Sequence, residues 1–138
     1  MSKVQTPLVT VDCVVVYNRS ILLIQRKYTP FKNYFALPGG FVDIGETVEE
    51  ACIRELYEET NVKIKKKDLK LIGVYSNPKR DPQRNTISIA FLTKLKKKIM
   101  INASDDALTA QFIKITNKIK LAFDHSAIIK DALTKLNI

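Results

Sequence analysis

Residues 40–62 read GFVDIGETVEEACIRELYEETNV and hold six glutamates, although the whole chain has a net charge of +9. Thr47 is followed three residues later by Glu50, a pairing that caps the first turn of a helix. Glu49 and Glu50 also lie where the positive end of a helix dipole favours carboxylates. The sequence therefore predicts a helix that begins at about Thr47.

One side of this helix is apolar. Its residues recur at i, i+3, i+4 and i+7, and at about 100° per residue they form a stripe of Ile53, Leu56, Tyr57 and Thr60. We expect this stripe to be the buried face of the helix.

Another side carries three carboxylates. Glu55, Glu58 and Glu59 fall within an arc of about 100°, and the small side chain of Ala51 leaves space beside Glu55. Mg²⁺ takes oxygen ligands and often bridges carboxylates to phosphates, and the preceding LPGG at 37–40 lets the backbone approach a ligand closely. Like charges also occur on solvated helices, where each pair costs only about 0.2–0.5 kcal/mol. The spacing alone leaves a metal site and a solvated face both open.

The segment resembles the signature of the Nudix hydrolases, G-x5-E-x7-R-E-U-x-E-E-x-G-U, in which U is a bulky aliphatic residue. The fitting positions are Gly40, Glu46, Arg54, Glu55, Leu56, Glu58, Glu59 and Val62. One position departs, because Asn61 stands where the family has its second glycine. Asparagine is the usual substitute for glycine in the left-handed backbone at a helix end, so we expect the change to be tolerated.

The resemblance implies hydrolysis of a nucleoside diphosphate linked to another group, with Mg²⁺ or Mn²⁺ as cofactor. The implied metal ligands are Glu55, Glu58, Glu59 and the carbonyl of Gly40, with Glu58 and Glu59 also counted among the catalytic residues. Such cations would neutralise charge on the phosphoryl oxygens and lower the pKa of a bound water. Arg54 would orient Glu46 or Glu58, and the resemblance places Arg54 and Glu46 among the catalytic residues as well. A surface ion pair between Arg54 and Glu58, worth about 0.3–0.5 kcal/mol, is the alternative.

The rest of the chain suits one α/β domain over residues 1–138. Strands are predicted at 8–17, 21–27, 34–37, 40–42, 69–76, 86–95 and 111–115, and a final helix at about 125–136. Asp124 is a good N-cap for that helix. The pattern predicts a mixed sheet flanked by helices, and the Nudix resemblance implies an α/β/α sandwich.

The cysteines and the N-terminal residues bear on where in the cell the protein is found. Cys13 and Cys52 lack metal or redox spacing, so we expect buried small apolar residues, which suits a reducing cytoplasm. The first residues lack the apolar core of a signal peptide, and no apolar run approaches the ~20 residues that a membrane span requires. We expect a soluble, cytoplasmic protein with no membrane partner.

Residues outside the signature suggest the class of substrate. In Nudix members acting on ADP-ribose a proline follows the signature by about sixteen residues, where dinucleoside polyphosphate members tend to have tyrosine; here the count from Val62 gives Pro78. Arg80 is the candidate contact to phosphate or terminal ribose, because a guanidinium binds phosphate oxygens bidentately. Phe35 and Phe123 could stack on adenine. Each residue has an alternative explanation. Pro78 could simply belong to a proline-rich loop, Arg80 could be a solvated charge on that loop, and the two phenylalanines could be core residues. ADP-ribose members often read Asp-Pro-Arg-Gly-His after the arginine, whereas residues 81–85 read DPQRN.

The general base is left open. No glutamate follows Glu59, so Asp105 and Asp106, in a segment similar to one in ADP-ribose members, are candidates, with Asp106 placed at the substrate. Otherwise Glu58 or Glu59 must serve. Turn formation is an equally good explanation of the two aspartates. The only histidine, His125, is expected to be structural.

The basic surplus allows other functions. Eighteen lysines could attract RNA, although runs such as 65–67 and 96–98 most simply keep loops solvated, and we do not expect a nucleic-acid partner. Hydrolysis of nucleoside triphosphates or of RNA 5′ ends is one alternative. A non-catalytic nucleotide sensor on the same scaffold is another. A homodimer is possible, but no interface is indicated.

Overall fold

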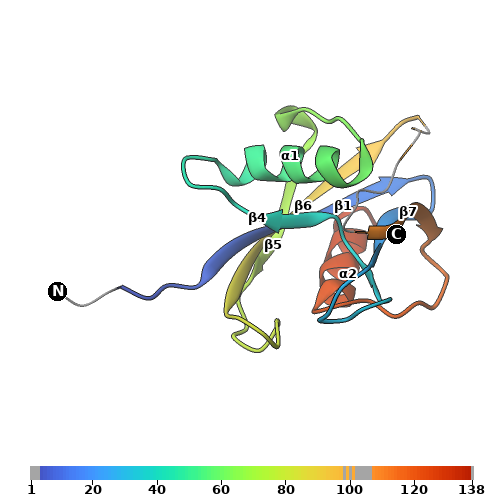
Figure 1. Ribbon diagram of the computed structural model, residues 1–138. Coiled ribbons are helices and arrows are strands. Elements are labelled where there is room, and N and C mark those ends of the chain that lie inside the picture. Colours follow the sequence, from blue (N-terminus) through green and yellow to red (C-terminus); the bar gives the residue numbers. More distant parts are fainter. Residues whose placement is uncertain (1–3, 98, 100, 102–106, 138) are drawn as a thin grey trace.

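The computed structural model describes residues 4–97, 99, 101 and 107–137, which form one mixed sheet and two α-helices (Figure 1). The elements are β1 (Leu8–Tyr17), β2 (Ser20–Arg26), β3 (Phe35–Ala36), β4 (Gly39–Phe41), α1 (Val48–Thr60), η1 (Lys66–Asp68), β5 (Lys70–Tyr75), β6 (Thr86–Leu95), β7 (Ala107–Lys114) and α2 (His125–Lys135). The predicted strands and helices are confirmed. The short 3₁₀ helix η1 was not predicted, and β7 begins four residues earlier than the sequence indicated.

Strand β1 organises the sheet. It pairs with β6 in parallel along its whole length, from Leu8 opposite Thr86 to Tyr17 opposite Leu95. On its other edge, the first half of β1 pairs with β4 and only its last residues pair with β2. The strands β4 and β2 therefore diverge from a common edge, and the sheet opens between them.

Two helices cover opposite faces of the sheet, with α1 above and α2 below in Figure 1. The alternation of β1 explains this, because successive side chains of a strand point to opposite faces. Val11, Cys13 and Val15 belong to the α1-side core, whereas Val14 and Val16 belong to the α2-side core. The predicted α/β/α sandwich is confirmed. Within the described part of the chain, neither helix is long and apolar enough to cross a bilayer.

Helix α1 begins and ends as its sequence predicts. The hydroxyl of Thr47 accepts the backbone N–H of Glu50 at 3.1 Å, and the carboxylate of Glu50 accepts the N–H of Thr47 at 2.9 Å. At the other end, Asn61 adopts the left-handed conformation with φ 66° and its N–H donates to the carbonyl of Tyr57. Asparagine thus performs the role of the family's glycine.

The buried face of α1 differs in part from the predicted stripe. Leu56 and Thr60 are buried as expected, but Tyr57 is 42% exposed. Ala51 and Cys52 are buried instead. The helix is rotated toward the side that also carries Glu55 and Glu59, because the sheet packs against it there.

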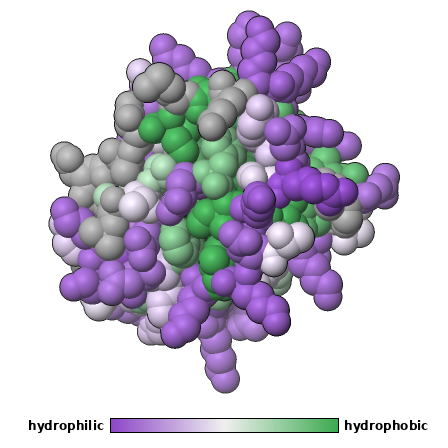
Figure 2. Space-filling model, turned by 90° about the vertical axis from the view of Figure 1, so that its right-hand side faces the viewer, coloured by the Kyte–Doolittle hydropathy of each residue, from purple (hydrophilic) through white to green (hydrophobic). Residues whose placement is uncertain are grey.

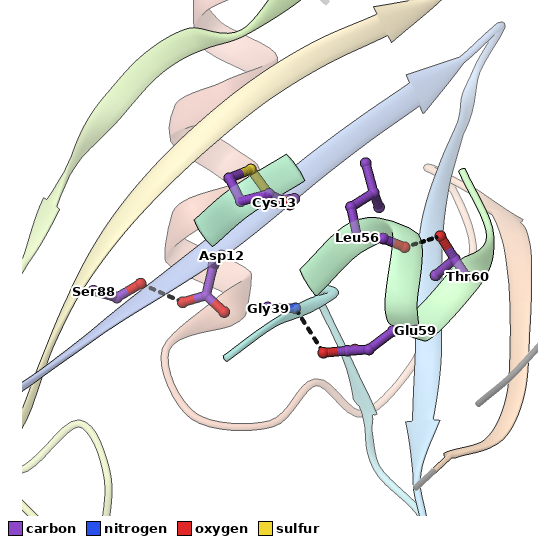
Figure 3. Close-up of a disulfide and its surroundings, with 8 residues drawn as sticks. Asp12, Cys13, Gly39, Leu56, Glu59, Thr60 and Ser88 are labelled. Carbon is purple, nitrogen blue, oxygen red and sulfur yellow. Dashed lines mark hydrogen bonds between the residues drawn. A yellow bond between two sulfur atoms is a disulfide. The ribbon is translucent and has the colours of Figure 1, made fainter. Parts of the chain in front are cut away.

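The two cysteines are both buried, as expected, but they are not separate thiols. Cys13 of β1 and Cys52 of α1 form a disulfide (Figure 3). The inward face of β1 lies directly under the buried face of α1, so residues 39 positions apart meet. Their burial is confirmed, but the pairing was not expected, because spacing along the chain does not reveal this packing.

Candidate active site

A cavity of about 400 Å³ lies where β4 and β2 diverge from β1. Its walls include Thr10 and Asp12 of β1, Phe41 of β4, and Ile24 and Arg26 of β2. The loop after β2, the loop after β5 and the start of α2 also contribute, as do three glutamates of α1, Glu55, Glu58 and Glu59. This volume lies within the range of small-molecule sites, roughly 300–1,000 Å³.

Arg54 connects the acidic residues at one edge of the cavity. Its guanidinium binds Glu46 bidentately, at 2.7 and 2.9 Å, and donates to the carbonyl of Phe41 at 3.0 Å. The remaining nitrogen donates to Glu55 at 2.8 Å and Glu58 at 3.3 Å. Hydrogen bonds from Arg54, and then from the backbone of Asp43, lower the pKa of Glu46 to about 2. The structure brings Arg54 together with both predicted partners, Glu46 and Glu58. Two nitrogens of its guanidinium are directed at Glu46.

Glu59 is the most unusual carboxylate of the site. One of its oxygens accepts the backbone N–H of Gly39 at 3.3 Å (Figure 3), while Oε2 is buried without a hydrogen-bond partner among the described residues. Burial, and then the adjacent carboxylate of Glu55, raise the pKa of Glu59 well above its usual value. An oxygen left unpaired in this way costs free energy unless a cation or proton meets it. A divalent cation between Glu59 and Glu55 would meet this oxygen, so the donor set fits such an ion.

Gly40 leaves space for this pair of carboxylates. A Cβ atom built on Gly40 would lie 2.6 Å from the carboxylate of Glu55, whose side chain is only 16% exposed. Any other residue here would displace that carboxylate. The close approach of backbone expected from the LPGG segment is thus toward an acidic side chain.

The three glutamates do not all converge, in contrast to the sequence prediction. Glu55 and Glu59 are neighbours, but the side chain of Glu58 is 57% exposed and turned to Arg54. No three His, Cys, Asp or Glu side chains within the described ranges are gathered as a metal site. Like charges repel, and Arg54 is the cation that attracts Glu55 and Glu58.

Arg80 occupies a different environment from the one expected of a phosphate contact. Its side chain is 5% exposed and binds Asp124 through two nitrogens, at 2.9 and 2.7 Å, with Thr86 accepting a further hydrogen bond at 2.8 Å. The carboxylate of Asp124 thus already occupies the edge of the guanidinium that could bind a phosphate through two nitrogens. Asp124 precedes α2 as predicted, but its side chain binds Arg80 instead of capping the helix.

Asp12 is a site residue that sequence reasoning missed. It accepts hydrogen bonds from Ser88 at 2.5 Å and His125 Nε2 at 3.2 Å, and Arg80 lies 3.5 Å away. Burial opposes its charge, but His125, Ser88 and Arg80 outweigh this and lower the pKa of Asp12. The signal was present, because an aspartate interrupts the apolar run at 8–17.

His125 transmits this network to the glycine-rich segment. Its Nδ1 accepts the backbone N–H of Leu37 at 3.0 Å, so Nε2 carries the proton donated to Asp12. His125 is buried, as suits its expected structural role. The chain Asp12–His125–Leu37 holds the backbone just before Gly39, which donates to Glu59.

The other predicted substrate residues are scattered. Phe35 packs against the α2-side core and does not line the cavity. Pro78 is exposed and also lies outside the lining. Residues 105 and 106 fall outside the described part of the chain. Phe123 does line the cavity, and the guanidinium of Arg26, which was not predicted, lies 4.9 Å from its ring centroid.

Arg80→Ala is expected to destabilise the fold by about 3 kcal/mol, because it leaves Asp124 and the buried Asp12 without their cation. Urea unfolding measures this loss. A large rise in KM with unchanged stability would instead restore Arg80 as the phosphate contact.

Comparison with known proteins identifies the family. The profile of the NUDIX domain matches residues 6–132. The chain is 52% identical over 125 residues to an ADP-ribose pyrophosphatase of Methanocaldococcus jannaschii, covering 91% of this chain and 72% of that protein. It is 32% identical to an ADPR responsive transcriptional repressor of Acinetobacter baylyi, covering 96% of this chain but only 55% of the repressor.

A solved structure agrees. The bifunctional NMN adenylyltransferase/ADP ribose pyrophosphatase of Francisella tularensis, complexed with AMP and a Mn ion, superposes with a TM-score of 0.84 at 34% identity. The match covers 97% of this chain and 43% of that protein. The fold, with its two covering helices, and the glutamates that α1 brings to the cavity agree with the matched profile. The chain therefore belongs to the Nudix hydrolases.

Proposed function

We propose that this Nudix pyrophosphohydrolase hydrolyses ADP-ribose to AMP and ribose 5-phosphate with Mg²⁺ or Mn²⁺. The observation that carries the proposal is the buried, unpaired oxygen of Glu59 beside Glu55 in a cavity of nucleotide size. The 52% identical relative named as an ADP-ribose pyrophosphatase supports the substrate, and the Mn ion in the Francisella protein supports the metal.

The ligands proposed for the metal are Glu55, Glu58, Glu59 and the carbonyl of Gly40. When bound, the metal would neutralise phosphoryl charge and lower the pKa of a water. Glu46 holds Arg54 through two hydrogen bonds, which keeps the guanidinium beside the acidic cluster without requiring Glu58. Glu58 has the exposed carboxylate and is our candidate to accept a proton from water.

The remaining residues would position the substrate. The network from Asp12 through His125 fixes the backbone that precedes Gly39 and Gly40. Phe123 lines the cavity with Arg26 over its ring, and this side of the cavity is our candidate for the base. These groups support a nucleotide with its diphosphate near α1.

A second candidate is a non-catalytic sensor of the same ligand. The 32% identity to a transcriptional repressor that responds to ADPR favours it. The chain spans only 55% of that repressor, so the comparison concerns the matched domain. Binding of ADP-ribose without turnover would distinguish the sensor from the enzyme.

The direct test is release of AMP from ADP-ribose with Mg²⁺ or Mn²⁺, measured beside nucleoside triphosphates and 5′-triphosphate RNA. A Glu58→Gln, Glu59→Gln double variant serves as the control. Release that disappears in the double variant supports the proposal. Turnover of another substrate but not of ADP-ribose refutes the substrate assignment, and binding without any turnover favours the sensor.

Three further expectations from the sequence stay predictions: a cytoplasmic location, a possible homodimer and the lack of a nucleic-acid partner. Hydrophilic side chains project from much of the face in Figure 2 around a central hydrophobic strip. This arrangement is compatible with the solvating role that we expect of the lysines.

A further inference from the structure

Arg84 is a cavity-lining arginine that binds no carboxylate within the described residues. Its guanidinium carbon lies 5.4 Å from the centroid of the Phe41 ring, a cation–π contact, and its side chain makes no hydrogen bond or ion pair with the described residues. Arg54 and Arg80, by contrast, are each bound to carboxylates through several nitrogens. The edge nitrogens of Arg84 are therefore available to a ligand.

The loop that carries Arg84 is anchored on both sides. Before it, Arg80 is fixed to Asp124, and the carboxylate of Asp81 accepts the backbone N–H of Gln83 at 2.8 Å. After it, the carbonyl of Asn85 accepts the N–H of Leu8 at 3.0 Å. The backbone at Arg84 is held in place, so its side chain is presented to the cavity from a defined position.

Phe41 lies beside the guanidinium of Arg84. The ring belongs to the residue directly after Gly40, and its backbone carbonyl accepts a hydrogen bond from Arg54 at 3.0 Å. A guanidinium attracted to the face of an aromatic ring keeps its N–H groups free to bind other partners. This geometry is suited to two parallel hydrogen bonds with phosphate oxygens, close to the carboxylates of α1.

A further cation would favour binding of a diphosphate at this site. A diphosphate approaching Glu55, Glu58 and Glu59 meets like charge, and the guanidinium of Arg54 is already shared among carboxylates. We propose that Arg84, held against Phe41, binds a non-bridging phosphate oxygen of the substrate and sets the affinity of the enzyme for diphosphates. This inference rests on the proposed function for the choice of a diphosphate substrate.

The test compares Arg84→Ala, Arg84→Lys and Phe41→Leu with Arg19→Ala, which removes an exposed arginine from the turn between β1 and β2. For ADP-ribose, Arg84→Ala should raise KM on the order of 10-fold or more, as loss of a charge-assisted hydrogen bond does, with kcat within about twofold. Arg84→Lys should recover part of the loss, since it keeps the charge without the fork. The KM of Phe41→Leu should lie between those of Arg84→Lys and Arg84→Ala, and the KM of Arg19→Ala should match that of the wild type.

Calorimetric titration with ADP separates this inference from the proposed function, because it needs no turnover. Weaker ADP binding by Arg84→Ala supports the inference even if the wild type fails to hydrolyse ADP-ribose, a result that would overturn only the proposed function. Equal ADP affinities of wild type and Arg84→Ala would overturn the inference. Failure of the wild type to bind ADP, or a fall in kcat without a change in KM, would also overturn it.

Discussion

Glu59→Gln is expected to lower kcat for ADP-ribose on the order of 10²–10³-fold while the chain folds normally, a loss comparable to removal of one electrostatic group from a transition state. The amide has nearly the size of the carboxylate and can still accept the N–H of Gly39. It cannot supply the negative charge that Oε2 offers to a cation. Steady-state kinetics in Mg²⁺ measures the loss.

The same substitution should raise the melting temperature of the metal-free protein. Glu59 buries a carboxylate oxygen that lacks a partner among the described residues, next to Glu55. An uncharged amide removes both the desolvation cost and the repulsion of the ionised form, so the gain should be largest at a pH above the raised pKa of Glu59. Mg²⁺ should stabilise the wild type, since it binds the folded state, and should stabilise Glu59→Gln much less. Loss of activity together with a gain in stability is typical of substitutions in a functional site.

Glu49→Gln is the matched control, because it makes the same change in the first turn of α1, away from the cavity lining. It should keep wild-type activity and the full Mg²⁺-induced rise in melting temperature. Our assignment of Glu59 is wrong if Glu59→Gln retains most of its kcat, or if it responds to Mg²⁺ as the wild type does.

The parts of the fold that could be predicted are those encoded by neighbours in the sequence. Thr47 and Glu50 are three residues apart, and the bond between them needs no tertiary contact to be foreseen. The alternation of β1 likewise follows from the period of a strand. The Nudix resemblance then supplied the layer order, because a signature of this specificity belongs to one fold.

The site could be predicted mainly along α1 and the segment just before it. Glu55, Glu58 and Glu59 look equivalent in the sequence, and only burial against the glycine-rich segment distinguishes the last of them. Arg80 and Asp124 are 44 positions apart, and His125 binds the backbone of a residue 88 positions away. Such contacts depend on how the layers pack, and spacing along the chain does not encode them.

Gly40→Ala is expected to reduce kcat on the order of 10²-fold with little effect on the free energy of unfolding, because small displacements of a catalytic group have large effects on rate. The added methyl would lie 2.6 Å from the carboxylate of Glu55. That carboxylate ends a flexible side chain and can swing away, so the fold adjusts and the acidic pair separates. Kinetics and urea unfolding of the same preparation measure both effects.

Two other glycine-to-alanine changes make this prediction specific. At Gly39 the new Cβ would meet the backbone carbonyl of Val11, which cannot move without disturbing the pairing of β1 with β4, so Gly39→Ala should lose about 1–3 kcal/mol of stability. At Gly73 it would meet only Tyr75 at 3.8 Å, an ordinary contact, and both stability and activity should be kept. If Gly40→Ala behaves like Gly73→Ala, the position of the Glu55 carboxylate is not needed for turnover. If it behaves like Gly39→Ala, the glycine serves the fold and not the site.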